Sequence, residues 1–290
     1  MNKTITRLTL FILVVSSLCS LIGIITSTGA QSYPFQAITG EIVSIYGTGL
    51  YAHDSLSMVA QGLASDWVTL VLAIPLTLWA LIKASSLFKA KLILVGLLGY
   101  FLYTYTSYAF LWNYNPLFIG YVVIMSLSFF ALILSLMSFD LSTLCLKFVP
   151  NLKTGIIIGF QGFVGLMICL LWLRKLAPTW FSSLPPVGLE HYTTLVIQAL
   201  DLGLIVPTVI LSAWLLHRRS PWGLLLSSIM ILKGIALLTS ISAMAISMLL
   251  SGVQTSWIEL AIFGFLDLFG VLALWRLLSQ LQPSTPSSSN

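Results

Sequence analysis

The sequence predicts an all-α integral membrane protein in which eight helices cross the bilayer as two parallel four-helix repeats. The chain is 58% hydrophobic and 7% charged, with a mean hydropathy of +1.03, whereas soluble domains carry about 25% charged residues. Its apolar segments are about 20 residues long, which is the length that spans a bilayer as a helix. None of them alternates as the strands of a transmembrane barrel do. The two halves also share a pattern of prolines and loops.

The apolar segments define the expected spans and two repeats. Residues 1–154 form the first repeat and residues 155–280 the second, with outer loops at 28–66 and 177–194. The last residues, 281–290, are rich in Ser and Pro and are expected to be a disordered tail. The spans are expected at 8–27, 67–84, 92–112, 117–138, 155–175, 195–216, 222–250 and 257–278.

The first span has two interpretations. Lys3 and Arg7, followed by an apolar run and the small residues at 27–30, resemble a secretory signal peptide. The run from Leu8 to Thr26 is longer than the usual apolar core of a signal peptide. We therefore favour an uncleaved anchor and keep the cleaved signal as the alternative.

The distribution of basic residues predicts the orientation. If the N-terminus is inside, only Arg174 and Lys175 fall outside, and the cytoplasmic side receives Lys3, Arg7, Lys83, Lys89, Lys91, Lys147, Lys153, Arg218, Arg219 and Arg276. Lys and Arg accumulate in cytoplasmic loops, so both termini are expected in the cytoplasm. The membrane is expected to be a plasma membrane or a bacterial inner membrane. Because these charges are dispersed, they indicate no nucleic-acid partner. The expected partners are the lipid bilayer and a small solute or ion.

The repeat prediction rests on paired landmarks. Pro75 lies midway along the second span, and Pro207 lies midway along the sixth. A shift of 135 residues aligns six positions, among them Gly99 with Gly234. Because each half has four spans, both halves have the same orientation, and the expected symmetry axis runs along the membrane normal.

Three ionisable residues within the apolar spans are candidates for a substrate or ion site. Lys233 and Asp267 lie near the middle of consecutive antiparallel spans, where each costs about 2.5–3.5 kcal/mol on insertion scales. We expect them to form an ion pair, which either serves a proton or ion site or only stabilises the bundle. Asp201 lies six residues before Pro207, where it could coordinate a cation or bond to a hydroxyl of a neighbouring helix.

The outer loops contain a second group of candidates. A metal site or an acid–base pair is possible there, but the spacing matches no metal motif, so no metal or cofactor is assigned. Asp54 is expected to cap a short helix from Ser55 to Leu63, and residues 41–51 could form a hairpin that turns at 47–49. The candidates are Tyr51, His53, Asp54, Asp66, Glu190 and His191.

A further pattern is a row of glycines in the fifth span, Gly155, Gly159, Gly162 and Gly165. Their helical spacing predicts close packing against a neighbouring helix.

Together these features favour a transporter of a small solute or ion, with its polar site in the second repeat. The alternatives are a membrane-embedded enzyme with a site that faces outward, and a non-catalytic membrane protein that assembles or senses other proteins. The chain contains no nucleotide-binding or nucleophile motif, so a non-enzymatic function is favoured. The oligomeric state is not indicated.

Overall fold

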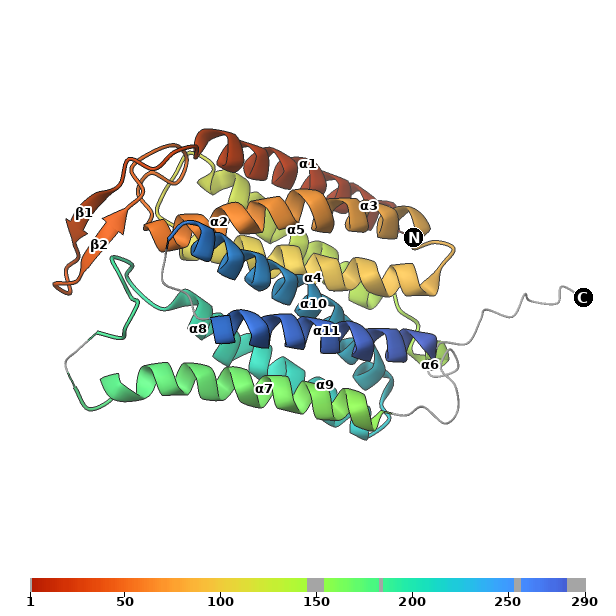
Figure 1. The fold of residues 1–290 in the computed structure, drawn as a ribbon. Coiled ribbons are helices and arrows are strands. Elements are labelled where there is room, and N and C mark those ends of the chain that lie inside the picture. The colour runs from red at the N-terminus through yellow and green to blue at the C-terminus, as the bar shows by residue number, and fades with distance from the viewer. Residues whose placement is uncertain (1, 145–153, 183–184, 253–256, 281–290) are drawn as a thin grey trace, which may run out of the picture.

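The computed structural model describes residues 2–144, 154–182, 185–252 and 257–280, which form a bundle of long helices with a small hairpin at one end (Figure 1). The predicted tail, 281–290, lies outside the described residues. Eight helices of the described part are long and apolar enough to cross a membrane, as predicted. They are Lys3–Thr26, Leu56–Lys83, Phe88–Phe110, Phe118–Met137, Gly155–Thr179, Val196–His217, Pro221–Leu250 and Ala261–Ser279.

The elements fall into two halves along the chain. The first half contains α1 (Lys3–Thr26), β1 (Tyr33–Gln36), β2 (Ile42–Ile45), α2 (Leu56–Val68), the π-helical turn η1 (Thr69–Ala73), α3 (Ile74–Lys83), α4 (Phe88–Phe110), α5 (Phe118–Met137) and α6 (Leu141–Leu144). The second contains α7 (Gly155–Leu176), the 3-10 turn η3 (Ala177–Thr179), α8 (Val196–Leu200), the π-helical turn η4 (Asp201–Ile205), α9 (Val206–His217), α10 (Pro221–Leu250) and α11 (Trp257–Ser279).

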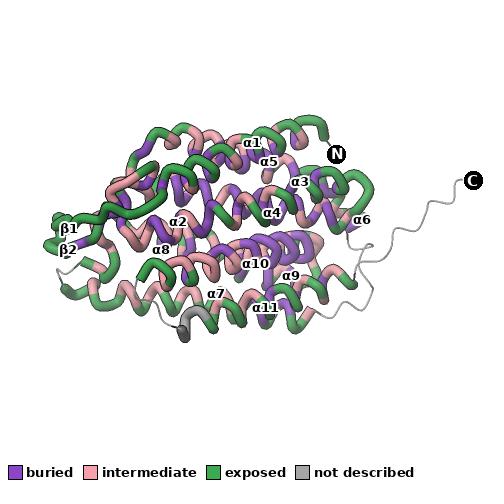
Figure 2. Tube along the Cα trace, turned by 45° about the horizontal axis from the view of Figure 1, so that its top comes forward, coloured by how far each residue is buried: buried purple, intermediate pink, exposed green. Residues whose placement is uncertain are grey.

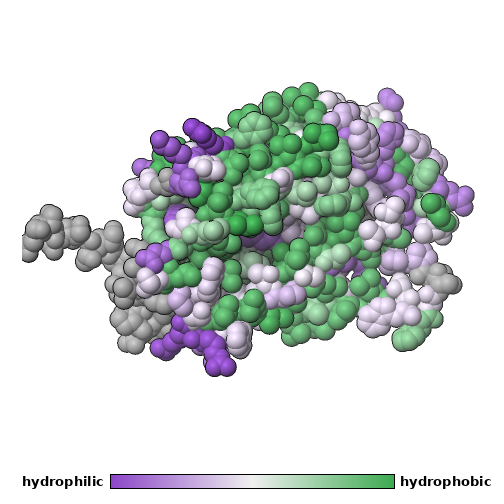
Figure 3. Space-filling model, turned by 180° about the vertical axis from the view of Figure 1, so that it is seen from behind, coloured by the Kyte–Doolittle hydropathy of each residue, from purple (hydrophilic) through white to green (hydrophobic). Residues whose placement is uncertain are grey.

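The surface has the distribution expected of a membrane-spanning bundle. A broad apolar band crosses the middle of the molecule, and polar residues gather at its two ends (Figure 3). We call the end with β1 and β2 the hairpin end, and the end where α1 begins and α11 finishes the terminal end (Figure 1). The length and apolar character of the helices make this a multi-pass membrane protein.

Helices α4 and α10 form the centre of the bundle. They carry much of the buried surface, whereas α7 and α11 are largely exposed (Figure 2). Gly96 lets the two helices approach, because a Cβ atom there would lie 2.4 Å from the Cβ of Leu232. Helix α10 has 30 residues, crosses the bundle obliquely (Figure 1) and also contacts α2, α9 and α11.

Each proline-bearing span contains a π-helical turn at the same position. The turn Thr69–Ala73 directly precedes Ile74-Pro75, and the turn Asp201–Ile205 directly precedes Val206-Pro207. The N–H of Ile74 donates to the carbonyl of Thr69, and the N–H of Val206 donates to that of Asp201, five residues earlier in both cases. Proline has no N–H and its ring crowds the preceding turn, and a wide turn relieves that crowding.

Helix neighbours follow the same order in the two halves. In the first half, α1 packs against α2, α3 and α5, and α4 packs against α3 and α5. In the second, α7 packs against α9 and α11, and α10 packs against α9 and α11. Between the halves, α2 packs against α10 and α8 packs against α4.

The loop at 28–66 differs from the prediction. Strands β1 and β2 pair antiparallel with Phe35 opposite Val43, so the hairpin turns near Gly40 and not at 47–49. Gly47 and Gly49 do have positive φ, but they fold the chain back onto the end of α1, where a Cβ at Gly49 would lie 2.1 Å from the carbonyl oxygen of Thr26. The short helix expected at 55–63 continues without a break into the second span.

The glycines of α7 also differ from the prediction. A Cβ atom at Gly155, Gly159 or Gly162 would meet no atom within 4 Å, so the prediction of close helix packing at these three positions is wrong. Only Gly165 faces a neighbour, because a Cβ there would lie 3.5 Å from Cγ1 of Ile210 on α9.

Candidate functional site

Asp201 is held by two donors from other helices. It begins the π-helical turn η4 and is 8% exposed. The hydroxyl of Tyr103 on α4 donates to its Oδ1 at 2.7 Å, and the indole Nε1 of Trp172 on α7 donates to its Oδ2 at 2.9 Å. The predicted alternative of a bond to a hydroxyl of a neighbouring helix is therefore confirmed. Both oxygens of this carboxylate have a donor.

Lys233 lies beside the same group of residues. Its side chain is 4% exposed, and its Nζ lies 3.9 Å from the centroid of the Tyr103 ring. Tyr103 therefore lies between two charged residues, because its ring faces the ammonium of Lys233 and its hydroxyl donates to the carboxylate of Asp201. In the described part of the chain, Nζ has no hydrogen-bond partner. A desolvated cation over an aromatic face is stabilised by about 2 kcal/mol. This contact does not satisfy the N–H donors of the ammonium, because an aromatic ring face offers no hydrogen-bond acceptor atom.

The direct ion pair expected between Lys233 and Asp267 is not formed. Instead, the hydroxyl of Thr239 donates to Oδ2 of Asp267 at 3.0 Å. Thr239 follows Lys233 by six residues, so on a helix it lies about 9 Å further along and about 120° around the axis. That rotation turns Thr239 toward α11 and Lys233 toward α4. Lys233 and Asp267 thus make separate contacts, and the prediction of a direct pair is wrong.

Residues of the two long loops meet at the hairpin end. The carboxylate of Asp54 accepts from the backbone N–H of Asn113 at 3.0 Å, from its side-chain amide at 3.1 Å and from the hydroxyl of Tyr192 at 3.0 Å. The Nε2 atom of His191 lies 2.9 Å from Nδ2 of Asn113 and 2.9 Å from the carbonyl oxygen of His53. These contacts connect the first half of the chain to the second. We call them the loop cluster.

Ser55 and Glu190 complete the loop cluster. The hydroxyl of Ser55 donates to the carboxylate of Glu190, and its oxygen accepts from the N–H of Met58. Ser55 is therefore the N-cap of α2, and the prediction that Asp54 is the cap is wrong. Asp54 instead accepts from the opposite loop. Burial raises the pKa of Asp54, against the opposing effect of its hydrogen bonds to Asn113.

Glu190 is strained as well as partly buried. Burial raises the pKa of its carboxyl group, and the bond from Ser55 opposes that rise. Its φ is +53°, in the left-handed region that residues other than glycine rarely adopt. Such a conformation is kept only where surrounding contacts hold it. The contacts of Glu190, His191 and Tyr192 therefore fix the second loop against the first.

Tyr51 and Asp66 form a separate group of contacts within the bundle. The hydroxyl of Tyr51 donates to Oδ2 of Asp66 at 2.7 Å, and that of Tyr108 lies 3.2 Å from Oδ1. Tyr108 also lies 3.1 Å from the carbonyl oxygen of Gly62. In the described structure Tyr51 and Asp66 make no hydrogen bond to the histidines with which the sequence grouped them. The predicted outer cluster is thus two sites.

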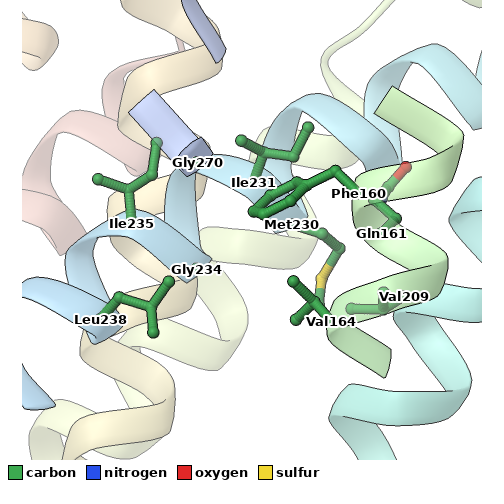
Figure 4. Close-up of a pocket in the computed structure, with 10 residues that line it drawn as sticks. All are labelled: Phe160, Gln161, Val164, Val209, Met230, Ile231, Gly234, Ile235, Leu238 and Gly270. Atoms are coloured by element: carbon green, nitrogen blue, oxygen red, sulfur yellow. The ribbon is translucent and has the colours of Figure 1, made fainter. Parts of the chain in front are cut away.

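A third polar group joins three helices of the second half. The side-chain amide of Gln161 on α7 donates to Ser212 on α9 at 2.6 Å and accepts from Ser227 on α10 at 3.0 Å. Gln161 also borders a cavity of about 40 Å³ between α7, α9, α10 and α11 (Figure 4). Phe160 extends across this cavity toward Ile231 and Gly270 (Figure 4). The lining is mostly apolar, so this cavity is a packing defect near the Gln161 network.

Several residues of these sites were not found from the sequence. The sequence does not indicate a site role for Trp172 or Asn113. A tryptophan near the end of a span is typical of an interfacial anchor, and an asparagine in a turn is typical of a loop. The π-helical turn at Asp201 could have been suspected from the proline that follows it.

Among the described residues no group of three His, Cys, Asp or Glu side chains could hold a metal ion. No protein-family model, no curated protein and no solved structure matches this chain.

Proposed function

We propose that this protein transports a small solute or ion across the membrane, and that Asp201, Tyr103 and Lys233 form the site that binds it. The observation that carries the proposal is the buried ammonium of Lys233, which has no hydrogen-bond partner among the described residues. Charged groups at this depth are expensive and commonly mark ion or substrate pathways. An anion, or the anionic group of a small solute, would satisfy the free donors.

The roles of the three residues differ. Asp201 has a donor on each oxygen, so it positions the site and attracts the ammonium. Tyr103 connects the two charges, through its hydroxyl to Asp201 and through its ring to Lys233. Lys233 is the group with unused donors. The favoured substrate class is accordingly a small anion or a solute with a carboxylate or similar group.

The π-helical turns of the two proline-bearing spans are the positions where these helices can bend. Such turns occur frequently at functional sites. Asp201 begins one π-helical turn, and the equivalent turn in the first half begins at Thr69, whose hydroxyl lies 3.1 Å from that of Tyr100 on α4. Both π-helical turns therefore contact α4, about one turn of that helix apart. Bending at either turn would move a residue that contacts α4.

The same features support the duplication and the orientation. Two four-helix repeats, 1–154 and 155–280, account for the shared order of helix neighbours and for the matched π-helical turns. The excess of Lys and Arg in the loops on one side of the spans supports an orientation with the terminal end in the cytoplasm. In that orientation the loop cluster lies on the outer side, where it joins Asp54 and Asn113 of one proposed repeat to His191 and Tyr192 of the other.

Transport can be tested with purified protein in sealed vesicles. We expect vesicles with the protein to take up at least one radiolabelled anion from a panel of inorganic anions, small carboxylates and amino acids. Lys233→Met and Asp201→Asn should each lower the initial rate at least tenfold. The matched controls, Lys83→Met and Glu41→Gln, change exposed residues of the same types and should leave the rate unchanged. Equal rates for Lys233→Met and the unchanged protein would refute the assignment of the site.

Orientation can be tested by thiol labelling of whole cells. A membrane-impermeant reagent should label Ser44→Cys, which lies in the hairpin, and should not label Ser86→Cys, which lies in the turn between α3 and α4. Labelling of the unchanged protein gives the background from the natural cysteines. The reverse pattern would overturn the proposed orientation.

A further inference from the structure

Helices α7 and α11 border an apolar crevice of about 420 Å³ in the second half of the bundle. Gly159, Phe160 and Phe163 line it from α7, and Phe265 and Phe269 line it from α11. The rings of Phe160 and Phe269, 5.3 Å apart, meet in its lining. The lining is too apolar to hold ordered water.

The crevice opens onto the lipid-facing surface. Phe163 is 49% exposed and Phe265 is 64% exposed, so both extend the apolar band of the molecule into the crevice. The corresponding pair in the first half, α1 and α5, is closely packed, and a Cβ at Gly120 would lie 3.0 Å from Sγ of Cys19. At Gly159 a Cβ would meet nothing within 4 Å. The opening is thus a feature of the second half.

A basic residue follows the crevice lining on α11. Arg276 follows Phe269 by seven residues on α11, which places it on nearly the same face of the helix and about 10 Å closer to the terminal end. It lies in the last turn of its helix, at the level of the lipid headgroups. An acyl chain in the crevice would bring a lipid phosphate to this guanidinium, which can bind phosphate with two parallel hydrogen bonds.

We infer that the crevice binds one anionic phospholipid of the bilayer, with an acyl chain between α7 and α11 and its phosphate at Arg276. The apolar lining would contact the hydrocarbon of the acyl chain, and Arg276 would lie near the headgroup at the end of α11. This inference does not depend on transport. The occupant is a lipid and not a second copy of the chain, because the charge of Arg276 complements an anionic headgroup.

Lipid retention tests this inference. The full-length protein is purified from vesicles that contain equal amounts of phosphatidylglycerol and phosphatidylcholine, and bound lipid is counted by native mass spectrometry. We expect one phosphatidylglycerol per protein. Gly159→Leu, which fills the crevice, and Arg276→Gln, which removes the charge, should each reduce its retention at least fivefold.

Two variants serve as matched controls. Gly162→Leu adds the same side chain one turn along α7 at a position outside the crevice lining, and Lys83→Gln removes a charge from another helix of the terminal end. Both should retain the lipid. Retention that is equal in all four variants would mean that the lipid is only annular and would overturn the inference. A protein dimer that Gly159→Leu disrupts would also overturn it, since the crevice would then hold a second copy.

Discussion

Removing the hydroxyl of Tyr51 should destabilise the bundle more than removing that of Tyr108. Tyr51 is fully buried, and in the described structure its hydroxyl bonds only to Asp66, at 2.7 Å. Tyr108 lies 3.2 Å from the same carboxylate and shares its hydroxyl with the carbonyl of Gly62. Hydrogen bonds to charged groups contribute about 1.5–3 kcal/mol, whereas those between helices in membranes average about 0.6 and reach about 1.7.

We therefore expect Tyr51→Phe to lower the free energy of unfolding by about 1.5 kcal/mol, where the two ranges meet. Tyr108→Phe should lower it by about 0.6 kcal/mol, the membrane average, because its bond is longer and shared. The assay is equilibrium unfolding in mixed micelles, followed by circular dichroism as the fraction of sodium dodecyl sulfate rises.

A double-mutant cycle separates the hydrogen bond from general packing. In an Asp66→Asn background, Tyr51→Phe should cost clearly less than it does in the natural chain, because the charged acceptor is absent. Tyr114→Phe, at an exposed tyrosine, is the control and should have no effect. If Tyr108→Phe costs as much as Tyr51→Phe, or if the cycle shows no coupling, the bond does not have the strength argued here.

Three further predictions follow from contacts described above. Gly23→Ala should destabilise the protein by about 1–3 kcal/mol in the same assay, because the new Cβ would lie 2.5 Å from Oδ2 of Asp66. Glu190→Gln should flatten the dependence of thermal stability on pH. The pKa of Glu190 is higher in the folded protein than its ordinary value of 4.5, so the protonated carboxyl group favours the folded state. This contribution is fully present below pH 4.5 and is lost as the pH rises through the pKa of the folded protein. Lys233→Met alone should lower stability more than Lys233→Met with Asp201→Asn, because both charged groups contact Tyr103 and the single change leaves only the buried carboxylate charged.

The first two of these predictions have a control with the same change elsewhere, and the third compares a single variant with a double one. Gly162→Ala adds a methyl group in open space on α7 and should stabilise slightly or have no effect. Glu41→Gln, on an exposed loop carboxylate, should leave the pH profile as it was. An unchanged pH profile for Glu190→Gln, or a double variant less stable than Lys233→Met, would contradict the corresponding argument.

The sequence predicted the spans well because spanning a bilayer is a local requirement of length and apolarity. It predicted the loop at 28–66 poorly, because Gly40, Gly47 and Gly49 all favour a turn and only the packing against α1 decides which of them closes the hairpin. The glycines of α7 were misread for a related reason. Spacing places glycines on a helix but does not tell whether a neighbour reaches them.

The candidate sites were predicted in part. Asp201 and Lys233 stood out because an ionisable group in an apolar span is costly, and that cost can be read from the sequence. The partner of Lys233 could not be read in the same way. Depth along two helices follows from counting residues, but the direction in which each side chain faces depends on how the helices are rotated in the bundle. Asp54 was misassigned because its partners, Asn113 and Tyr192, are remote in the chain.

The length of α10 has a consequence for the lipid that surrounds the protein. Its 30 residues extend over about 45 Å, whereas the hydrocarbon of a typical bilayer is about 30 Å thick. The helix can match that thickness only by tilting or by extending past the hydrocarbon. A thicker bilayer would let α10 stand more upright against α4, and a thinner one would tilt it further. The contact between Lys233 and Tyr103 lies where these two helices meet, so acyl-chain length is a variable that acts directly on the geometry of that contact.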